Sequence, residues 1–274
     1  MFGRLFSLKL GTRIILVTLT ILVIIVALNY WVFMTRYAKS AQHAMVEKAA
    51  AFTAVADEAK NHANKVSASG ALDTESLLAD LAAVQEAGRS YKDAKIFNTI
   101  PVVAGWTAAQ EAAERENIEF RISAFEARNL DNEPDPGSFE ADLLTKLRQQ
   151  VEARGDEYAY GVDEATNSLH YMRAIRLEQS CMMCHGKPGN QYDTDNDGKD
   201  PVGFAMKSWS VGKMHGSYHV VMPLDSVDAQ VASFLTNGLT WTVPVVVVGV
   251  VLFFRNRSTN LIFHRWPWGQ ILLA

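Results

Sequence analysis

Apolar residues are concentrated in two long runs, 14–34 and 234–254, and the segment between them mixes apolar and polar residues as a soluble domain does. Each run approaches the roughly 20 apolar residues that a helix needs to cross a bilayer core. The pattern therefore predicts five parts: an N-terminus over 1–13, a transmembrane helix over 14–34, a soluble domain over 35–233, a second transmembrane helix over 234–254 and a tail over 255–274.

Each run has a rival interpretation. The first could be the core of a cleaved signal peptide, but it is longer than such cores and no small-residue cleavage pattern follows before Arg36. This favours an uncleaved anchor. The second could be a buried strand, but its length favours a span, and membrane helices tolerate residues such as Pro244 and Gly238.

Basic residues lie at the outer end of each run: Arg4, Lys9 and Arg13 before the first, and Arg255, Arg257 and Arg265 after the second. Such residues mark the cytoplasmic side of a membrane protein. We therefore expect two spans in a bacterial inner membrane, both termini in the cytoplasm and residues 35–233 in the periplasm. The tail, which contains Trp266 and Trp268, could lie on the membrane surface or contact a partner.

The segment between the runs begins with helical patterns and continues with strand patterns. Small apolar residues recur at helical spacing over 37–66, a stripe that could pack on its own domain or form a dimer contact. Further helices are predicted after Asp73, over 100–117 with Pro101 in the first turn, and over 139–154. Strands are predicted at 120–122, 158–162, 169–177 and 217–222, with a loop over 128–137.

Helices followed by strands with tight turns predict an α+β fold. We expect an antiparallel sheet with flanking helices and a long N-terminal helix, placed between the two transmembrane helices. The net charge of −4 argues against a nucleic-acid surface. The chain has two cysteines, three positions apart, which points to local chemistry rather than to a disulfide scaffold.

Residues 181–185 read Cys-Met-Met-Cys-His, the C-x-x-C-H pattern of covalent haem attachment. Cys181 and Cys184 would bond the haem, and His185 would bind the iron. A thioredoxin-like redox pair and half of a zinc site are alternatives, but the chain has no second cysteine pair and both would leave the histidine unexplained. The predicted location outside the cytoplasm agrees with haem attachment.

The second axial ligand of such an iron is left open by the sequence. The candidates are histidines and methionines, with Met172 and His215 preferred: Met172, Met206, Met214, His62, His170, His215 and His219. Arg173 and Arg176 precede the motif and could pair with haem propionates, although surface arginines are equally compatible with the pattern.

Asp193, Asp195 and Asp197, followed by Gly198, resemble the start of a calcium-binding loop. Phe204 stands where a complete EF-hand has a bidentate glutamate. A solvated acidic turn is therefore favoured over a calcium site.

An ordered set of segments resembles one family: 100–106, 120–122, 128–135, 181–186, 212–216 and 222–224. These are similar to the periplasmic c-type haem PAS-like sensor domains of chemotaxis receptors and sensor kinases, over roughly residues 35–230. The resemblance implies a PAS-like sheet that senses redox state or a small gaseous ligand, with Cys181, Cys184 and His185 in the haem roles. Leu130 stands where the family pattern has a proline, and such receptors continue into an output domain whereas this chain stops at Ala274.

Two functions follow from these observations. The first is a membrane-anchored mono-haem c-type cytochrome that senses redox state or a small ligand and signals through a partner protein. The second is an electron-transfer haem subunit of a membrane complex. An enzymatic role has little support, because no distal acid–base set can be identified. Membrane lipid, a protein partner and a possible homodimer are the expected contacts.

Overall fold

The computed structural model of the chain describes residues 10–116, 118–193 and 195–263. It divides into two compact units, one formed by Met1–Ala38 with Asp225–Ala274 and the other by Lys39–Leu224. The predicted N-terminus before residue 10 and the tail beyond residue 263, with Trp266 and Trp268, lie outside the described residues, as does Asn117 at the end of a predicted helix.

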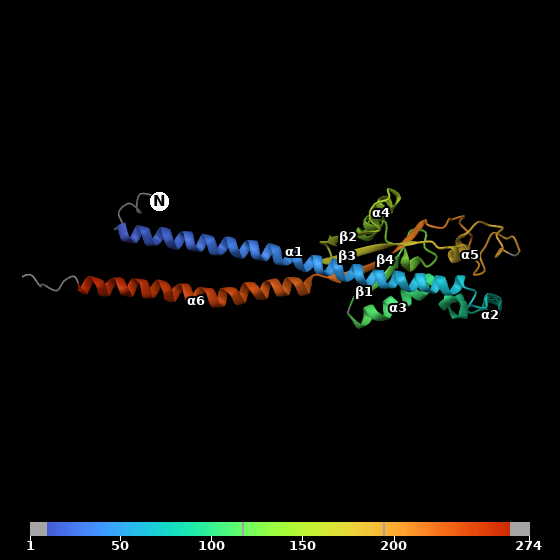
Figure 1. Cartoon of the computed structure of the whole chain (residues 1–274), viewed down its shortest axis with the longest axis horizontal. Coiled ribbons are helices and arrows are strands. Elements are labelled where there is room, and N and C mark those ends of the chain that lie inside the picture. Colours follow the sequence, from blue (N-terminus) through green and yellow to red (C-terminus); the bar gives the residue numbers. More distant parts are fainter. Residues whose placement is uncertain (1–9, 117, 194, 264–274) are drawn as a thin grey trace, which may run out of the picture. The chain divides into compact units, whose positions relative to one another are not determined.

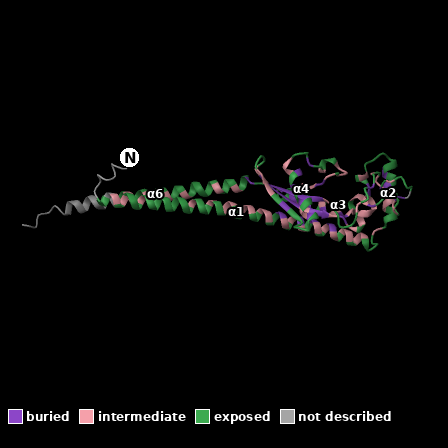
Figure 2. Ribbon diagram, turned by 90° about the horizontal axis from the view of Figure 1, so that it is seen from above, coloured by how far each residue is buried: buried purple, intermediate pink, exposed green. Residues whose placement is uncertain are grey.

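The first unit contains the apolar stretches of two long helices, α1 (Leu10–Ala68) and α6 (Asp225–Phe263) (Figure 1). The predicted membrane helix over 14–34 and the predicted helix over 37–66 are thus one continuous helix. Both α1 and α6 are long and apolar enough to cross a membrane. Figure 2 shows that their apolar stretches are largely exposed and are not covered by the rest of the protein.

Within this unit α1 and α6 touch through aromatic side chains. The Tyr30 hydroxyl donates to the carbonyl oxygen of Phe234 (2.8 Å), and the Tyr37 hydroxyl lies 2.6 Å from Oε1 of Gln230. A Cβ added to Gly238 would lie 1.4 Å from the Tyr30 hydroxyl oxygen, so a side chain at this position of α6 would displace the Tyr30 ring. Glycine at 238 therefore permits the close approach of Tyr30.

The second unit is built around four antiparallel strands in the order β1-β4-β3-β2, counted among the described residues. Their bounds are β1 (Glu119–Ser123), β2 (Tyr158–Asp163), β3 (Ser168–Arg176) and β4 (Met214–Pro223). The four predicted strands are confirmed, although β4 begins earlier than predicted. Because the helices surround one antiparallel sheet, the α+β prediction is also confirmed.

The other helices of this unit are α2 (Thr74–Glu86), α3 (Pro101–Arg115), α4 (Phe139–Glu152) and the short α5 (Met182–His185), with 3₁₀ turns η2 (Tyr91–Asp93), η3 (Lys95–Thr99), η4 (Leu130–Asn132) and η5 (Gln179–Cys181). The predicted helices α2, α3 and α4 are present and begin close to the residues that the sequence indicates, whereas α5 and the 3₁₀ turns were not predicted. Asp73 caps α2 by accepting from the backbone N–H of Ser76 (3.1 Å), and Pro101 opens α3.

Helices cover both faces of the sheet (Figure 1). The second half of α1 and α3 pack on one face, with a core that includes Ala56, Ala113, Phe120, Tyr171 and Tyr218. Helix α4 packs on the other face around Leu143, Leu144, Leu147, Ala159 and Met172. Alternation along β3 and β4 assigns side chains to the two faces.

Close packing of α3 on α1 depends on one glycine. A Cβ added to Gly105 would lie 2.6 Å from the carbonyl oxygen of Ala56. Since that oxygen belongs to the backbone of α1, it could not move aside without shifting the helix. The small residues of α1 therefore contact their own domain, one of the two alternatives that the sequence left open.

A chain of polar side chains is buried between α4 and the sheet. Ser168 Oγ lies 2.9 Å from His170 Nε2, and His170 Nδ1 lies 3.0 Å from His219 Nε2. His219 Nδ1 lies 3.2 Å from Glu140 Oε1, and Arg121 donates to Glu140 Oε2 (2.5 Å). The side chains of this network thus satisfy one another.

This environment moves two pKa values downward. Burial, followed by the charge of His219, lowers the pKa of His170 from 6.5 to about 4. Burial by itself would raise the pKa of Glu140, but the hydrogen bond and charge of His219 and the charge of Arg121 lower it from 4.5 to about 2. At neutral pH the network therefore holds a neutral His170 and an ionised Glu140.

Acidification should destabilise the second unit through these groups. The unfolded chain takes up a proton at His170 near pH 6.5 and at Glu140 near pH 4.5, whereas the folded protein does so only near 4 and 2. Stability is thus complete above about pH 6.5 and falls below it. Urea titrations of the full chain in detergent at pH 7 and pH 4.5 give the free energy of unfolding lost on acidification. This loss should be about 2 kcal/mol smaller in His170→Gln than in the wild type.

The matched control is His43→Gln, because the His43 side chain is 73% exposed. This variant should lose as much stability on acidification as the wild type. Equal losses in His170→Gln and in the wild type would contradict the interpretation.

Candidate functional site

The Cys-Met-Met-Cys-His segment forms a compact helical turn directly after β3. Cys181 ends η5, and residues 182–185 form α5. The backbone N–H of Cys181 donates to the carbonyl oxygen of Glu178 (3.0 Å), and the N–H of Glu178 lies 3.3 Å from Cys181 Sγ. Residues three apart on a helical turn share a face, so the two thiols point to the same side. Both are free and half-buried.

This turn forms part of the wall of a cavity of about 270 Å³. Cys181, Cys184, His185 and His215 are all in the wall. Most of the remaining lining is apolar and comes from α2, η3, α3, the strand ends and the loop before β4: Leu77, Leu81, Ile96, Phe97, Ile100, Val102, Val103, Trp106, Ile122, Ile175, Leu177, Val202 and Phe204. Such a cavity suits a large flat apolar group.

A β-bulge brings His215 to this cavity. In the pairing of β3 with β4, Ile175 is opposite Gly216 but Arg176 is opposite Met214, so His215 is an extra residue on β4. In a regular strand side chains alternate between the two faces of the sheet, and a bulge can turn a side chain away from the face that this alternation would give it. The centroids of the His185 and His215 rings are 5.2 Å apart.

Trp209 fixes both imidazoles. Its ring stacks on that of His185 at 4.9 Å and 16°, and it lies 3.9 Å from that of His215. The backbone N–H of Trp209 also donates to the carbonyl oxygen of His185 (2.9 Å). The loop before β4 is thereby tied to the end of α5, which keeps the two histidines side by side.

Both imidazoles are neutral in this environment. Burial, followed by the charge of Arg128, lowers the pKa of His185 to about 3, and burial, followed by the charge of Lys207, lowers the pKa of His215 to about 4. Nδ1 of His185 is buried and has no hydrogen-bond partner among the described residues. A neutral imidazole whose polar capacity the protein leaves unused is suited to binding a metal.

The thiols fit covalent attachment. Burial, followed by the charge of Asp200, raises the pKa of Cys184 to about 11, so this side chain is a protonated thiol at neutral pH. The donor set of two thiols, two neutral imidazoles and an apolar wall fits a haem.

A buried ion pair supports the turn. Arg128 pairs with Asp200, whose side chain is fully buried, and it donates to the carbonyl oxygen of Cys184 (2.8 Å). The guanidinium also lies 5.1 Å from the ring centroid of Phe204. Asp200 Oδ1 accepts from the backbone N–H groups of Val202 (2.9 Å) and Phe204 (3.0 Å). One pair thus joins the loop after β1, the turn of α5 and the loop before β4.

A model of the Tll0287-like protein family matches residues 38–223, more than half of the chain. The chain belongs to the Tll0287-like family. The match covers the segment between the two apolar runs and includes all four strands and the Cys-Met-Met-Cys-His turn. It confirms the family resemblance on which the sequence analysis drew.

One solved structure is similar to this Tll0287-like chain, the crystal structure of the cyanobacterial haem protein Tll0287. The sequences are 26% identical, and the alignment covers 43% of this chain and 69% of that chain with a TM-score of 0.33. No curated protein matches the chain.

Of the seven candidate second ligands in the Tll0287-like domain, His215 lies in the cavity wall with His185. The other six are all described residues and do not line the cavity: Met172, Met206, Met214, His62, His170 and His219. Met172 is fully buried in the core under α4, and His170 and His219 belong to the polar network on the same face. The structure therefore does not bring the preferred candidate Met172 to His185.

The two arginines predicted to approach haem propionates have protein partners. Arg173 donates to Oγ1 of Thr53 (3.0 Å) and does not line the cavity. Arg176 lines the cavity edge, but it binds both carboxylate oxygens of Glu157 (2.9 and 3.1 Å from Nε).

Sequence reasoning missed Arg128 and Trp209. Arg128 belonged to a segment quoted for the family resemblance, which was the available signal, but it was given no role. Nothing in the pattern around Trp209 distinguished it from an ordinary loop tryptophan. The acidic residues Asp193, Asp195 and Asp197 lie in the same loop as Trp209, between α5 and β4, and do not line the cavity.

Removing Arg128 should destabilise the Tll0287-like domain, because the buried carboxylate of Asp200 would lose its counter-charge. We expect Arg128→Met to lower the free energy of unfolding by about 3 kcal/mol, measured by urea titration of the full chain in detergent. Adding Asp200→Asn removes the charge but keeps Oδ1 as an acceptor, so the double variant should recover part of the loss.

The control for this pair is Arg89→Met. Arg89 pairs with Asp93 on the surface, with side chains 59% and 45% exposed, so its loss should cost no more than about 1 kcal/mol. The interpretation fails when Arg128→Met and Arg89→Met cost the same.

Proposed function

We propose that this chain is a membrane-anchored c-type cytochrome that carries one covalent haem and acts as a redox or small-ligand sensor. The observation that carries the proposal is the cavity whose wall holds Cys181, Cys184, His185 and His215 together. Tll0287 is described as a haem protein, which agrees with the proposal. The role proposed for the chain is not enzymatic.

Attachment needs only the chemistry of the two thiols. Each S–H adds across one vinyl group, so that a C–S bond forms and the hydrogen goes to the neighbouring carbon. No oxidant or reductant is consumed once the thiols are reduced. Both cysteines are free thiols in the structure, on one side of a single helical turn.

A bound haem would supply a reversible one-electron couple at its iron. His185 would bind the iron from the side of the attachment turn, and we propose His215 as the second protein ligand. Trp209 packs against both rings, and most of the cavity wall is apolar. A protein ligand at the second position makes redox sensing a better fit than direct capture of a gas, which would first have to displace His215.

The sensor interpretation depends on the route from the cavity to α6. His215 is near the start of β4, and β4 ends at Pro223, two residues before α6 begins. A change at His215 would be passed along a central strand to the start of that helix. The PAS-like character that the resemblance implies belongs to this proposal, because PAS-like domains are expected to signal in this manner.

The location proposed is a bacterial inner membrane crossed by α1 and α6. Both helices are long and apolar enough for this, and the basic residues outside the apolar runs favour cytoplasmic termini. The haem domain would then lie in the periplasm, where covalent attachment takes place. We propose membrane lipid and a signalling or redox protein as partners, and a homodimer as a further possibility.

Electron transfer in a membrane complex is the second candidate function. The proximity of His185 and His215 favours it, because two protein ligands keep the iron environment nearly constant through the redox cycle. In that case α1 and α6 are anchors and the redox partner is a donor or acceptor protein.

Covalent attachment is tested by expressing the chain with the haem-attachment machinery. The wild type should keep a Soret band after denaturation, and its intact mass should equal the polypeptide plus one haem. Cys181→Ser/Cys184→Ser should lose both signals, because no thiol remains to add to a vinyl group. Met182→Leu, between the cysteines, is the matched control and should retain both. A wild type with the mass of the bare polypeptide rejects the proposal.

Replacing His215 tests the second ligand. The reduced wild type should show little spectral change with carbon monoxide, whereas reduced His215→Ala should bind it with a clear Soret shift. His43→Ala, exposed on α1, should behave as the wild type. Carbon monoxide binding to the wild type as readily as to His215→Ala would exclude His215 as the ligand.

Hydrogen exchange at the start of α6 separates the two functions. It should differ between the oxidised and reduced wild type in a sensor and should be equal in a carrier.

A further inference from the structure

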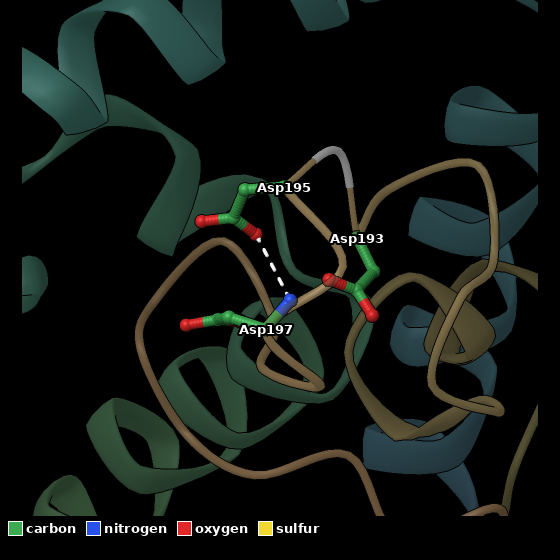
Figure 3. A group of neighbouring side chains, drawn as sticks. All are labelled: Asp193, Asp195 and Asp197. Atoms are coloured by element: carbon green, nitrogen blue, oxygen red, sulfur yellow. Dashed lines mark hydrogen bonds between the residues drawn. The ribbon is translucent and has the colours of Figure 1, made fainter.

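The loop between α5 and β4 contains a second group of polar side chains, separate from the cavity. Asp193, Asp195 and Asp197 alternate along the chain, and one carboxylate oxygen from each lies within 4.8 Å of the others (Figure 3). Oxygen atoms that bind one calcium ion lie 2.3–2.6 Å from it, so two of them are separated by at most about 5 Å. The three carboxylates therefore satisfy the spacing for a shared ion.

The state of Asp193 is the independent observation that points to a ligand. Its side chain is buried, with the residue only 4% exposed. Oδ2 accepts from the backbone N–H of Gly189 (2.7 Å), but Oδ1 is buried with no hydrogen-bond partner among the described residues. In Figure 3 one oxygen of Asp193 faces Asp195 and Asp197. A buried carboxylate oxygen without a partner is costly unless a cation compensates it.

The backbone of the loop has the form that such a site requires. Gly198 has φ of +76°, a conformation that glycine adopts at no cost, and it follows the third aspartate as the glycine does in calcium loops. The ammonium nitrogen Nζ of Lys199 lies 2.9 Å from Asp197 Oδ2, and the Lys199 side chain is 54% exposed. This ammonium would swing into solvent when a divalent cation takes its place.

We propose that Asp193, Asp195 and Asp197 bind one calcium ion. Hard carboxylate oxygens suit calcium, and water and backbone carbonyl groups would complete the six to eight ligands. Because Phe204 replaces the bidentate glutamate, the affinity should be that of weak extracellular sites, with a dissociation constant of about 0.1–1 mM. The sequence by itself favoured a solvated acidic turn; the burial of Asp193 reverses that preference.

The ion would stabilise a loop that forms part of the cavity wall. The carbonyl oxygen of Gly198 accepts from the N–H of Met206 (3.0 Å), and Asp200 pairs with Arg128. Val202 and Phe204, which line the cavity, follow directly. Calcium would therefore act on stability and loop order, and the site does not depend on whether haem is bound.

Calcium binding is tested on the full chain in detergent after removal of metals with EGTA. Isothermal titration with calcium chloride should give one site per chain. At about 10 mM calcium the unfolding temperature should rise by about 5 °C, since this concentration is roughly one hundred times a dissociation constant of 0.1 mM. Asp195→Asn and Asp197→Asn change exposed side chains, so both variants should fold and should lose at least tenfold in affinity.

Asp156→Asn is the matched control, because it removes one charge from another exposed turn of the same unit, and it should bind calcium as the wild type does. Absence of calcium stabilisation in the wild type would overturn the proposal, as would equal stabilisation by magnesium or unchanged affinity in both site variants. The Soret band, read in the same samples, reports on the haem independently, so failure of the calcium site is distinguishable from failure of the proposed function.

Discussion

The antiparallel pairing of β3 with β4 is the constraint on which the candidate site depends. The loop of residues 177–213 leaves the sheet where β3 ends and returns where β4 begins. Because the two strands are antiparallel, both points lie at the same end of the strand pair. The Cys-Met-Met-Cys-His turn and His215 are therefore neighbours although His185 and His215 are 30 positions apart in the sequence. The bulge after Ile175 decides the outcome, because perfect register would have given His215 the opposite face.

Much of the fold could be predicted because its signals are local. The cap at Asp73, the proline that opens α3, the alternation in the strands and the two apolar runs each depend on neighbouring residues. The continuity of α1 through residue 68 was not predicted, since the change from apolar to alanine-rich sequence resembles a boundary. The site was predicted only where chemistry is encoded in adjacent residues, at Cys181, Cys184 and His185. Whether they hold haem remains the proposal.

The residues around that motif could not be found from the sequence because they depend on distant contacts. Met172 and His215 were equal candidates while only their residue types were known, and strand alternation and a bulge place them on opposite faces of the sheet. Arg176 is occupied by Glu157, whereas Arg128 reaches the carbonyl oxygen of Cys184 from a loop more than fifty positions away. Sequence spacing contains no information on either pairing.

The arrangement of charges explains why the cavity can be both apolar and ordered. Arg128, which is itself in the wall, pairs with the buried Asp200, and the network of His170, His219 and Glu140 is confined to the α4 face. The imidazoles in the wall are thus left neutral, and Nδ1 of His185 has no hydrogen-bond partner among the described residues. An unpaired buried polar atom costs stability, and the proposed haem iron would recover that cost on binding. A domain built in this way would gain stability from the proposed haem. The same logic applies to Asp193, whose unpaired oxygen would be compensated by the proposed calcium ion.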